Sequence, residues 1–368
     1  MHTYAALRAR LKSEPATWLV TGAAGFIGSN LLERLLDLNQ QVIGLDNFAT
    51  GKRDNLAAVQ AAVGPARWRN FHFMEGDIRA PGDCRSACHG VRYVLHHAAQ
   101  ASVPQSIADP LACHASNLSG FLNMLVAARD GGVSRFVYAS SSAVYGDAAG
   151  LPALEAETGH ALSPYGLTKY VDELYAQLFA RCYGFASIGL RYFNVFGPRQ
   201  DPRGAYAAVI PLWIASLIEG LPVHINGDGQ TTRDFCYIDN VVQANLLAAT
   251  IGDAAAVNQV YNIAMGVGTT LDQLFETIRQ ALESRGPPLR GRRPGYRDFR
   301  PGDVHHSQAD IGKAVRLLGY RPAVQLREGL ARAVDWYAGR PPAPRAAAGD
   351  WSNLPVATHA RVASRPSS

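Results

Sequence analysis

The amino-acid sequence predicts an α/β protein built on a doubly wound parallel sheet, with helices on both faces. The first observation is an alternation, through the first half of the chain, of short apolar runs with segments whose apolar residues recur at helical spacing. The second is a glycine-rich stretch, residues 21–29, between the first apolar run and the first helical segment. The third is that polar motifs follow the apolar runs, and sheets of this kind bind ligands beyond the carboxyl ends of their strands.

The periodicity defines the elements of this first half. Because the expected strands are separated by helices rather than tight turns, they should pair in parallel and be covered on both faces. In chain order we expect strands at residues 18–20, 41–45, 71–74, 91–95 and 135–139, and helices at residues 26–38, 56–63 and 112–129.

From residue 193 onward the pattern is less regular, because proline and glycine interrupt it repeatedly. Helical spacing returns at residues 240–250, 271–283 and 311–318. We therefore expect a smaller α/β C-terminal substrate lobe at residues 193–338, with crossovers back to a first domain at residues 18–192. The remaining expected divisions are an N-terminal helical extension at residues 1–17, with Tyr4, Leu7 and Leu11 on one face, and a disordered tail at residues 339–368.

The composition is that of an ordinary globular protein, with 368 residues, 48% hydrophobic and 18% charged. We expect no membrane span and no signal peptide, since no suitable apolar run is found. Five scattered cysteines favour reduced thiols in a cytoplasm. Cys84 and Cys88 precede His89, but no second ligand pair follows at zinc spacing, so two thiols on a helix are favoured over a metal site.

The net charge of +5 comes mainly from arginine. Nucleic-acid binding is not expected, because the arginines are dispersed and no RNA- or DNA-binding motif accompanies them. The densest group lies late in the chain among prolines and glycines, where guanidinium groups could meet a diphosphate or simply face solvent. Its members are Arg285, Arg290, Arg292, Arg293, Arg297 and Arg300.

The glycine-rich stretch has the spacing of a dinucleotide-binding turn. Gly22 permits a tight turn, Gly25 lets a backbone approach a pyrophosphate, and Gly28 lets the next helix lie close to its strand. The N-terminus of that helix attracts phosphate. Asp46, at the end of the second strand, is placed to hold a ribose diol, and its charge favours NAD over NADP. The alternative is an ordinary βα turn followed by a surface aspartate.

Two further strand ends carry candidate cofactor contacts of a Rossmann-type domain. After the third strand, the carboxylate of Asp77 could reach an adenine or its ribose. After the fourth, the small residues Ala98 and Ala99 would let the backbone lie along the cofactor. The histidines at positions 96 and 97 are interpreted as packing residues rather than ligands.

The fifth strand leads into a serine run, residues 140–142, and Ser163-Pro164 then predicts the start of a helix. This helix contains Tyr165 and Lys169, which lie one turn apart on the same face. A phenol titrates near 10, so acting as a base near pH 7 requires a shift of about 3 units, or roughly 4 kcal/mol. A neighbouring ammonium and the positive nicotinamide ring both favour phenolate. Tyr-x-x-x-Lys alone is common, but with the serine run and the glycine turn it indicates a catalytic pair.

Together these motifs resemble those of extended short-chain dehydrogenase/reductases, and among them UDP-hexose 4-epimerases, over roughly residues 17–340. The resemblance is greatest to bacterial UDP-N-acetylglucosamine 4-epimerases of surface-polysaccharide synthesis. It implies tightly bound NAD, a UDP-sugar substrate and a cytoplasmic homodimer. The motifs that carry it are the glycine stretch, Gly76-Asp77, the His-x-Ala-Ala turn, the serine run, Tyr165 with Lys169, and residues 44–51, 191–198 and 204–211.

The mechanism that the resemblance implies begins with Tyr165, which takes the proton of the sugar 4-hydroxyl while carbon 4 gives a hydride to NAD. Ser141 assists, Lys169 holds the phenolate and the nicotinamide ribose, and the hydride returns to the other face of the 4-keto sugar. The implied cofactor contacts are Gly22, Gly25, Phe26, Ile27, Gly28, Asp46, Asn47, Asp77, Ile78, Ala98, Ala99, Tyr165 and Lys169. The implied substrate contacts are Ser102, Ser141, Ser142, Asn194, Gln200, Ala208, Val209, Arg233, Arg300, Asp303 and Ser307.

The resemblance also narrows the reaction and the substrate. Relatives that dehydrate or decarboxylate their sugar carry an acidic residue where this chain has Ser142 and Ala143, so elimination is disfavoured. Ser307 stands where a large aromatic residue would exclude N-acetyl groups, so UDP-GlcNAc and UDP-GalNAc are expected over UDP-glucose and UDP-galactose. Ala101 departs from the glycine of close relatives and adds a methyl group to the pocket. A UDP-uronic acid substrate, a dehydrogenase that releases NADH and an idle NAD-binding scaffold or sensor remain open.

Overall fold

The centre of the molecule is a seven-stranded sheet in which every neighbouring pair is parallel, in the order β11-β6-β5-β4-β1-β2-β3. The computed structural model describes residues 3–148, 150–204, 207–286, 289, 291–299 and 304–339. The sheet confirms the predicted fold class. Its strands are β1 (Thr17–Thr21), β2 (Gln41–Asp46), β3 (Phe71–Glu75), β4 (Tyr93–His96), β5 (Arg135–Ser141), β6 (Ser187–Tyr192) and β11 (Gln259–Ile263).

Two strand boundaries differ from the expectation by two residues, and the others differ by one residue at most. The strand expected at residues 91–95 begins two residues later, and β5 runs on to Ser141 because Ser140 and Ser141 still pair with Arg191 and Tyr192 of β6. The sheet therefore carries the serine run to its carboxyl edge.

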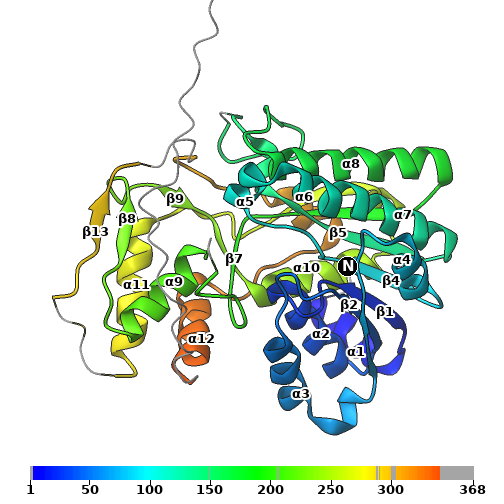
Figure 1. Cartoon of the computed structure of the whole chain (residues 1–368), viewed down its shortest axis with the longest axis horizontal. Helices are drawn as coiled ribbons and strands as arrows, with labels where there is room; N and C mark the ends of the chain where they lie inside the picture. Colours follow the sequence, from blue (N-terminus) through cyan, green and yellow to red (C-terminus); the bar gives the residue numbers. More distant parts are fainter. Residues whose placement is uncertain are drawn as a thin grey trace, which may run out of the picture.

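Helices cover both faces of the sheet (Figure 1). Successive strand residues point to opposite sides: Val20 packs in the cluster that contains α2 and α10, and Leu19 packs in the cluster that contains α4 and α7. On one side lie α1 (Tyr4–Ser13), α2 (Phe26–Asp37), α3 (Arg53–Trp68) and α10 (Ile238–Thr250); on the other lie α4 (Pro81–Cys88), α7 (Gly120–Asp130) and α8 (Pro164–Tyr183).

Local sequence explains where these helices begin and bend. The Ser163 hydroxyl accepts a hydrogen bond from the Gly166 N–H and so caps α8, with Pro164 in the first turn. Helix α3 is longer than expected and contains a kink at Gly64, which has φ +75° and is followed by Pro65. In α1, Leu7 and Leu11 are buried against the first domain, and the Gln40 side chain donates to the Leu11 carbonyl.

The premise that no run is long and apolar enough to span a bilayer does not hold. By length and composition, a helix at Pro110–Asp130 is apolar enough to cross a membrane. It joins α6 (Pro110–His114), a π-helical segment (Ala115–Ser119) and α7, and its buried residues include Phe121, Met124 and Leu125. Its apolar character is used to cover a face of the sheet.

The second lobe has short strands in place of a large sheet. They form three two-stranded pairs: β7 (Asn194–Phe196) with β10 (Phe235–Tyr237), β8 (His224–Asn226) with β13 (Gly295–Arg297), and β9 (Thr232–Arg233) with β12 (Thr269–Thr270). Helices α9 (Val209–Ile218), α11 (Leu271–Glu283) and α12 (Leu326–Ala338) pack around them (Figure 1). Strand β11 pairs with β6 of the large sheet, and helix α10 packs in the same cluster as α2. The expected tail lies, from residue 340, outside the described residues.

Several smaller expectations can be placed. Cys84 and Cys88 are buried on α4, and no group of three or more metal-ligating side chains occurs in the described part of the chain. Of the arginine group, Arg285 pairs with Asp335, and Arg292 donates to the Gly220 carbonyl. Neither lines the pocket described below, and Arg290 and Arg300 lie outside the described residues.

Candidate active site

The glycine turn joins β1 to α2 with very little space between its parts. Gly22 has φ +70°, and a Cβ atom on it would lie 3.0 Å from the backbone of His97 and of Ala98. A Cβ atom on Gly28 would lie 2.0 Å from the Gly22 carbonyl oxygen. The predicted tight turn and the predicted close approach of helix and strand are therefore both present.

The N-terminus of α2 is suited to a phosphate group. Gly25 caps the helix without any side-chain hydrogen bond, so no side chain takes up the first N–H groups, which begin at Phe26 and Ile27. Such N–H groups together with the helix dipole attract a pyrophosphate. The turn, packed too closely for Cβ atoms at Gly22 and Gly28, and the N–H groups beside it fit a dinucleotide.

Asp46 ties the loop after β2 to the glycine turn. Its carboxylate accepts hydrogen bonds from the Ala24 N–H at 2.9 Å and the Phe48 N–H at 2.8 Å, and burial raises its pKa. Each carboxylate oxygen has a second lone pair, so a ribose diol could still donate to it.

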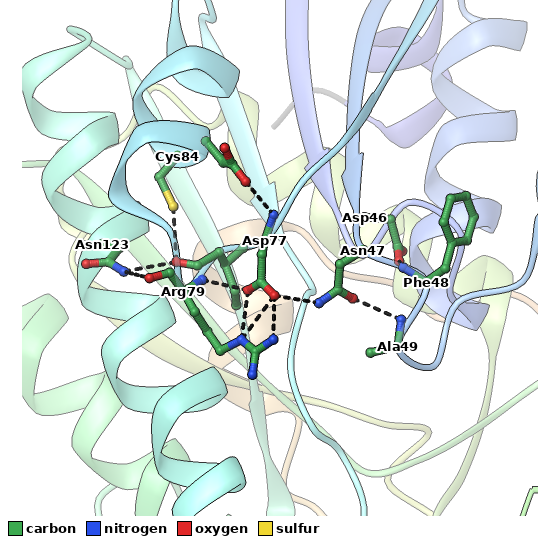
Figure 2. Close-up of polar contacts among 10 residues, drawn as sticks. Asp46, Asn47, Phe48, Ala49, Asp77, Arg79, Cys84 and Asn123 are labelled. Atoms are coloured by element: carbon green, nitrogen blue, oxygen red, sulfur yellow. Dashed lines mark hydrogen bonds and ion pairs between the residues drawn. The ribbon is translucent and has the colours of Figure 1, made fainter.

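Beside this loop lies a second polar cluster, which Figure 2 shows. The Asn47 amide donates to Asp77 at 2.9 Å, and the Arg79 guanidinium contacts both carboxylate oxygens of Asp77. These hydrogen bonds lower the pKa of Asp77 to about 2, and the bond from Arg79 has the largest effect. The next residue, Ile78, is buried, and its carbonyl accepts from Asn123 of α7. The loops after β2 and β3 are thus joined where the adenosine end of the cofactor is expected.

Thr21, which sequence reasoning missed, organises the turn after β4. Its hydroxyl accepts from the N–H groups of His97 and Ala98, both at 3.1 Å, and lies 2.8 Å from Nδ1 of His96. Burial lowers the pKa of His97 to about 4, and its Nε2 lies 2.8 Å from the Tyr192 hydroxyl. The two histidines are packing residues, as predicted. Ala98 and Ala99 follow them at the sheet edge.

The serine run and the tyrosine helix are in direct contact. Ser141 ends β5, and its hydroxyl accepts from the Ala143 N–H at the start of a 3-10 turn, Ser142–Tyr145. A Cβ atom on Gly166 of α8 would lie 2.7 Å from the Ala143 carbonyl oxygen. Tyr165 immediately precedes this glycine and is half-buried. The structure thus brings the elements that carry Ser141 and Tyr165 together.

Lys169 is almost fully buried one turn further along α8, at 3% exposure. Its ammonium lies 3.2 Å from the Asp172 carboxylate, a residue that the sequence did not single out. A neutral network supports the same turn: Asn117, in the π-helical segment, donates to the Thr168 hydroxyl at 3.1 Å, and that hydroxyl donates to the Tyr165 carbonyl at 2.8 Å. Ser106, on the short helix α5 (Val103–Ala108), accepts from the Tyr165 N–H. A buried asparagine inside an apolar helix was the one available signal for this network.

A pocket of about 280 Å³ opens in the second lobe. Five predicted substrate contacts line it: Asn194, Gln200, Ala208, Val209 and Arg233. It is also lined by His224 and Asn226 of β8, which sequence reasoning missed because a strand of three residues has no periodicity to read. The predicted residues Arg300 and Asp303 lie outside the described part of the chain.

Four predicted contacts do not line this pocket, and Ser141, described above, is one of them. Ser102 caps α5, where its hydroxyl accepts from the Gln105 N–H. Ser142 lies in the 3-10 turn beside Ser141. Ser307 is half-buried, and its N–H donates to the carbonyl of Thr232, the residue before Arg233. Ser102 and Ser142 thus lie in the first domain, and Ser307 lies next to the strand that carries a pocket arginine.

Comparisons with known proteins agree with this geometry. The profile of the NAD dependent epimerase/dehydratase family matches residues 18–264. A solved UDP-N-acetylglucosamine 4-epimerase from Methanobrevibacter ruminantium, in complex with UDP-N-acetylmuramic acid, is 36% identical with a TM-score of 0.80, over 88% of this chain and 99% of that one. A UDP-glucose 4-epimerase from Thermotoga maritima, with UDP-glucose, is 39% identical with a TM-score of 0.78, over 88% and 98%.

A further relative, the UDP-glucose 4-epimerase of Mycolicibacterium smegmatis, is 34% identical over 87% of this chain and 97% of its own length. The predicted kinship, enzyme class and cofactor, NAD, are confirmed. The chain belongs to the NAD-dependent epimerase/dehydratase family.

Proposed function

We propose that this enzyme interconverts UDP-GlcNAc and UDP-GalNAc at carbon 4 of the sugar. The observation that carries the proposal is the contact between α8 and the serine segment, which places Tyr165, Lys169 and Ser141 at the same sheet edge as the glycine turn. A dinucleotide and a sugar alcohol can therefore meet there.

The residues of the chain supply the proton chemistry. Tyr165, as phenolate, takes the proton of the 4-hydroxyl, and Ser141 orients that hydroxyl by a hydrogen bond. Lys169 stabilises the phenolate by its charge and would hold the nicotinamide ribose. NAD held at the glycine turn and by Lys169 would supply reversible hydride transfer at carbon 4, from one face of the sugar and to the other. Tyr165 then gives the proton back to the oxygen on carbon 4.

The neighbours of Ser141 favour epimerisation over elimination. Elimination needs an acid and a base next to the reacting carbons, and Ser142 and Ala143 supply neither. A simple oxidation followed by reduction needs no further proton-transfer group.

The pocket in the second lobe is the proposed UDP site. The Asn194 amide and the Arg233 guanidinium suit a diphosphate. Arg233 also donates to the carbonyls of Thr232 and His305, so the strand that carries it is tied to the segment leading to Ser307. Firm binding at UDP would leave the 4-keto sugar free to turn about its diphosphate linkage. Arg300 and Asp303 remain predicted members of this site.

Ser307 supports the choice of N-acetylated sugars. A hydroxymethyl side chain leaves room for an acetamide on carbon 2, which a large aromatic residue would exclude. We infer that UDP-glucose and UDP-uronic acids are the poorer substrates. The product would serve as a precursor for surface polysaccharides.

A homodimer in the cytoplasm is part of the same proposal. Leu167, Leu174 and Leu178 on α8 are 42–50% exposed, and Leu111 on α6 is 81% exposed. Apolar side chains gathered on neighbouring helices are suited to a second copy of the chain.

The test is incubation of the purified protein, without added cofactor, with UDP-GlcNAc and separately with UDP-glucose and UDP-glucuronic acid. Chromatographic separation of the 4-epimers should show conversion of UDP-GlcNAc in preference to the others. Preference for one of the other sugars would overturn the substrate assignment. Stoichiometric NADH release would indicate a dehydrogenase, and no conversion of any sugar after adding NAD would favour an idle NAD-binding protein.

A further inference from the structure

Lys169 has a fully buried counter-charge that the mechanism above does not use. Asp172 lies three residues further along α8, and its side chain is 0% exposed. One carboxylate oxygen lies 3.2 Å from the Lys169 ammonium. Within the described residues the other oxygen is buried and has no hydrogen-bond partner. Since a buried carboxylate normally has its oxygens satisfied, this arrangement requires an explanation.

The groups around Asp172 leave Lys169 as its electrostatic partner. The next residue, Glu173, is already engaged by the Arg191 guanidinium and the Ser140 hydroxyl. The other titratable groups near the pair are Tyr138 on β5, Cys113 on α6, His96 on β4 and His97 directly after it. Burial raises the pKa of Tyr138 and of Cys113 and lowers the pKa of both histidines, so all four are neutral near pH 7.

Burial also raises the pKa of Asp172 itself, although Lys169 acts to lower it. Holding this carboxylate charged is therefore costly. If the only task of Lys169 were to favour the Tyr165 phenolate, a carboxylate at 3.2 Å would be a disadvantage, because it reduces the positive field. The pairing thus points to a need to limit that field.

We propose that Asp172 is a positioning residue that holds Lys169 in place and limits the positive field at Tyr165 and at the nicotinamide site. The consequence concerns the return of the hydride and rests on the proposed function. An oxidised nicotinamide ring is positively charged and a reduced one is neutral, so a strong cation beside the ring would favour NADH. The Asp172 carboxylate opposes this effect, so that the hydride is returned to the sugar and the enzyme rests with NAD.

The experiment compares Asp172→Asn with the wild type. The amide keeps an acceptor for Lys169 but removes the charge. The acid limb of the pH profile of kcat/KM should move to lower pH by about one unit, because phenolate forms more easily in a more positive field. The ratio of bound NADH to bound NAD at equilibrium with a redox dye, measured without any sugar, should rise about tenfold.

The control is Asp130→Asn on α7, whose carboxylate is 55% exposed and paired with Arg129. Water and salt screen that charge, so neither readout should move. If Asp172→Asn leaves both the pH profile and the NADH ratio unchanged, the proposal is overturned. The ratio of bound NADH to bound NAD is measured without sugar, so it tests the role of Asp172 even if the enzyme converts no UDP-sugar. Failure of the proposed function can therefore be distinguished from failure of this proposal.

A second variant covers the case in which Asp172→Asn does not fold. Lys169→Met with Asp172→Asn removes both charges, and replacing both partners of a buried pair is tolerated far better than removing one. If only the double variant folds, its ratio of bound NADH to bound NAD without sugar should stay within about twofold of the wild type, because both charges are removed together, and a tenfold rise would overturn the proposal. If neither variant folds, Asp172 has a structural task and the proposal is wrong.

Discussion

The two parts of the molecule hold their predicted ligand contacts in different ways. In the first domain the contacts lie at the carboxyl edge of a sheet that is buried on both faces, and buried or partly buried hydrogen bonds of Thr21 and Asp46 fix the loops. In the second lobe they lie on strands of two or three residues, joined in pairs. A retained cofactor calls for the first kind of site, and a sugar that must turn over calls for the second. Substitutions in the first domain should therefore affect catalysis or stability, and those in the lobe should affect substrate choice.

The largest effect should come from Tyr165→Phe. The change removes one oxygen atom, and with it the only group on that side chain that can take a proton. Turnover of the UDP-sugar should fall by roughly 10²–10⁴. Measured kcat together with the NAD content of the purified variant tests this prediction, because the cofactor should remain bound.

The same experiment can contradict the proposed difference between the first domain and the second lobe. If Tyr165→Phe loses NAD as well as activity, the helix is required for the cofactor site itself and the division into separate tasks does not hold. Full activity would mean that another group is the base.

The next largest effect should come from Gly28→Ala. The new methyl group would lie 2.0 Å from the Gly22 carbonyl oxygen, and neither backbone can yield without moving α2 from its strand. Overpacking of this kind costs about 1–3 kcal/mol. We expect a lower melting temperature and little retained NAD after purification.

Gly82→Ala on α4 is the matched control, because nothing lies within 4 Å of a Cβ atom there. Its stability should stay within about 0.5 kcal/mol of the wild type. Equal losses in the two variants would show that the contact with Gly22 does not decide the result, since helix propensity alone favours alanine at both positions.

In the second lobe, Ser307→Tyr should alter specificity rather than stability. The aromatic ring would occupy the space proposed for the acetamide group. We expect kcat/KM for UDP-GlcNAc to fall roughly tenfold to a hundredfold, with a smaller change for UDP-glucose. The second sugar is the internal control, and equal losses on both would contradict the gating role of Ser307.

The first domain and the second lobe also differ in how much of their structure could be predicted from the sequence. The strand ends, the glycine turn and the Tyr165 helix were predictable, because each depends on residues close together in the chain. His224 and Asn226 were not, since a three-residue strand acquires its place only by pairing with a distant segment, residues 295–297.

The hydrogen-bond and ion-pair partners of the site side chains could not be predicted from the sequence either. The charge on Asp46 was visible, but not that two backbone N–H groups bind its carboxylate. Likewise the spacing of Tyr165 and Lys169 was visible, whereas the pairing of Lys169 with Asp172 depends on burial that the pattern does not reveal. Tertiary contacts decide such pairs, and a linear pattern contains little information about them.

The smallest effect should come from Arg79→Gln, at the exposed side of the first domain. Arg79 lowers the pKa of Asp77 to about 2, below its ordinary value of 3.8. A carboxyl group with a lowered pKa adds stability above pH 3.8 and loses it as the pH falls toward 2. Because Arg79 is half exposed, solvent limits the contribution to about 1 kcal/mol or less. The variant should be slightly less stable than the wild type in denaturant at pH 7, and the difference should shrink between pH 4 and pH 2. Arg67→Gln, which breaks the weaker exposed pair with Asp37, should produce a smaller change, and a larger one would contradict the contribution assigned to the Arg79–Asp77 pair.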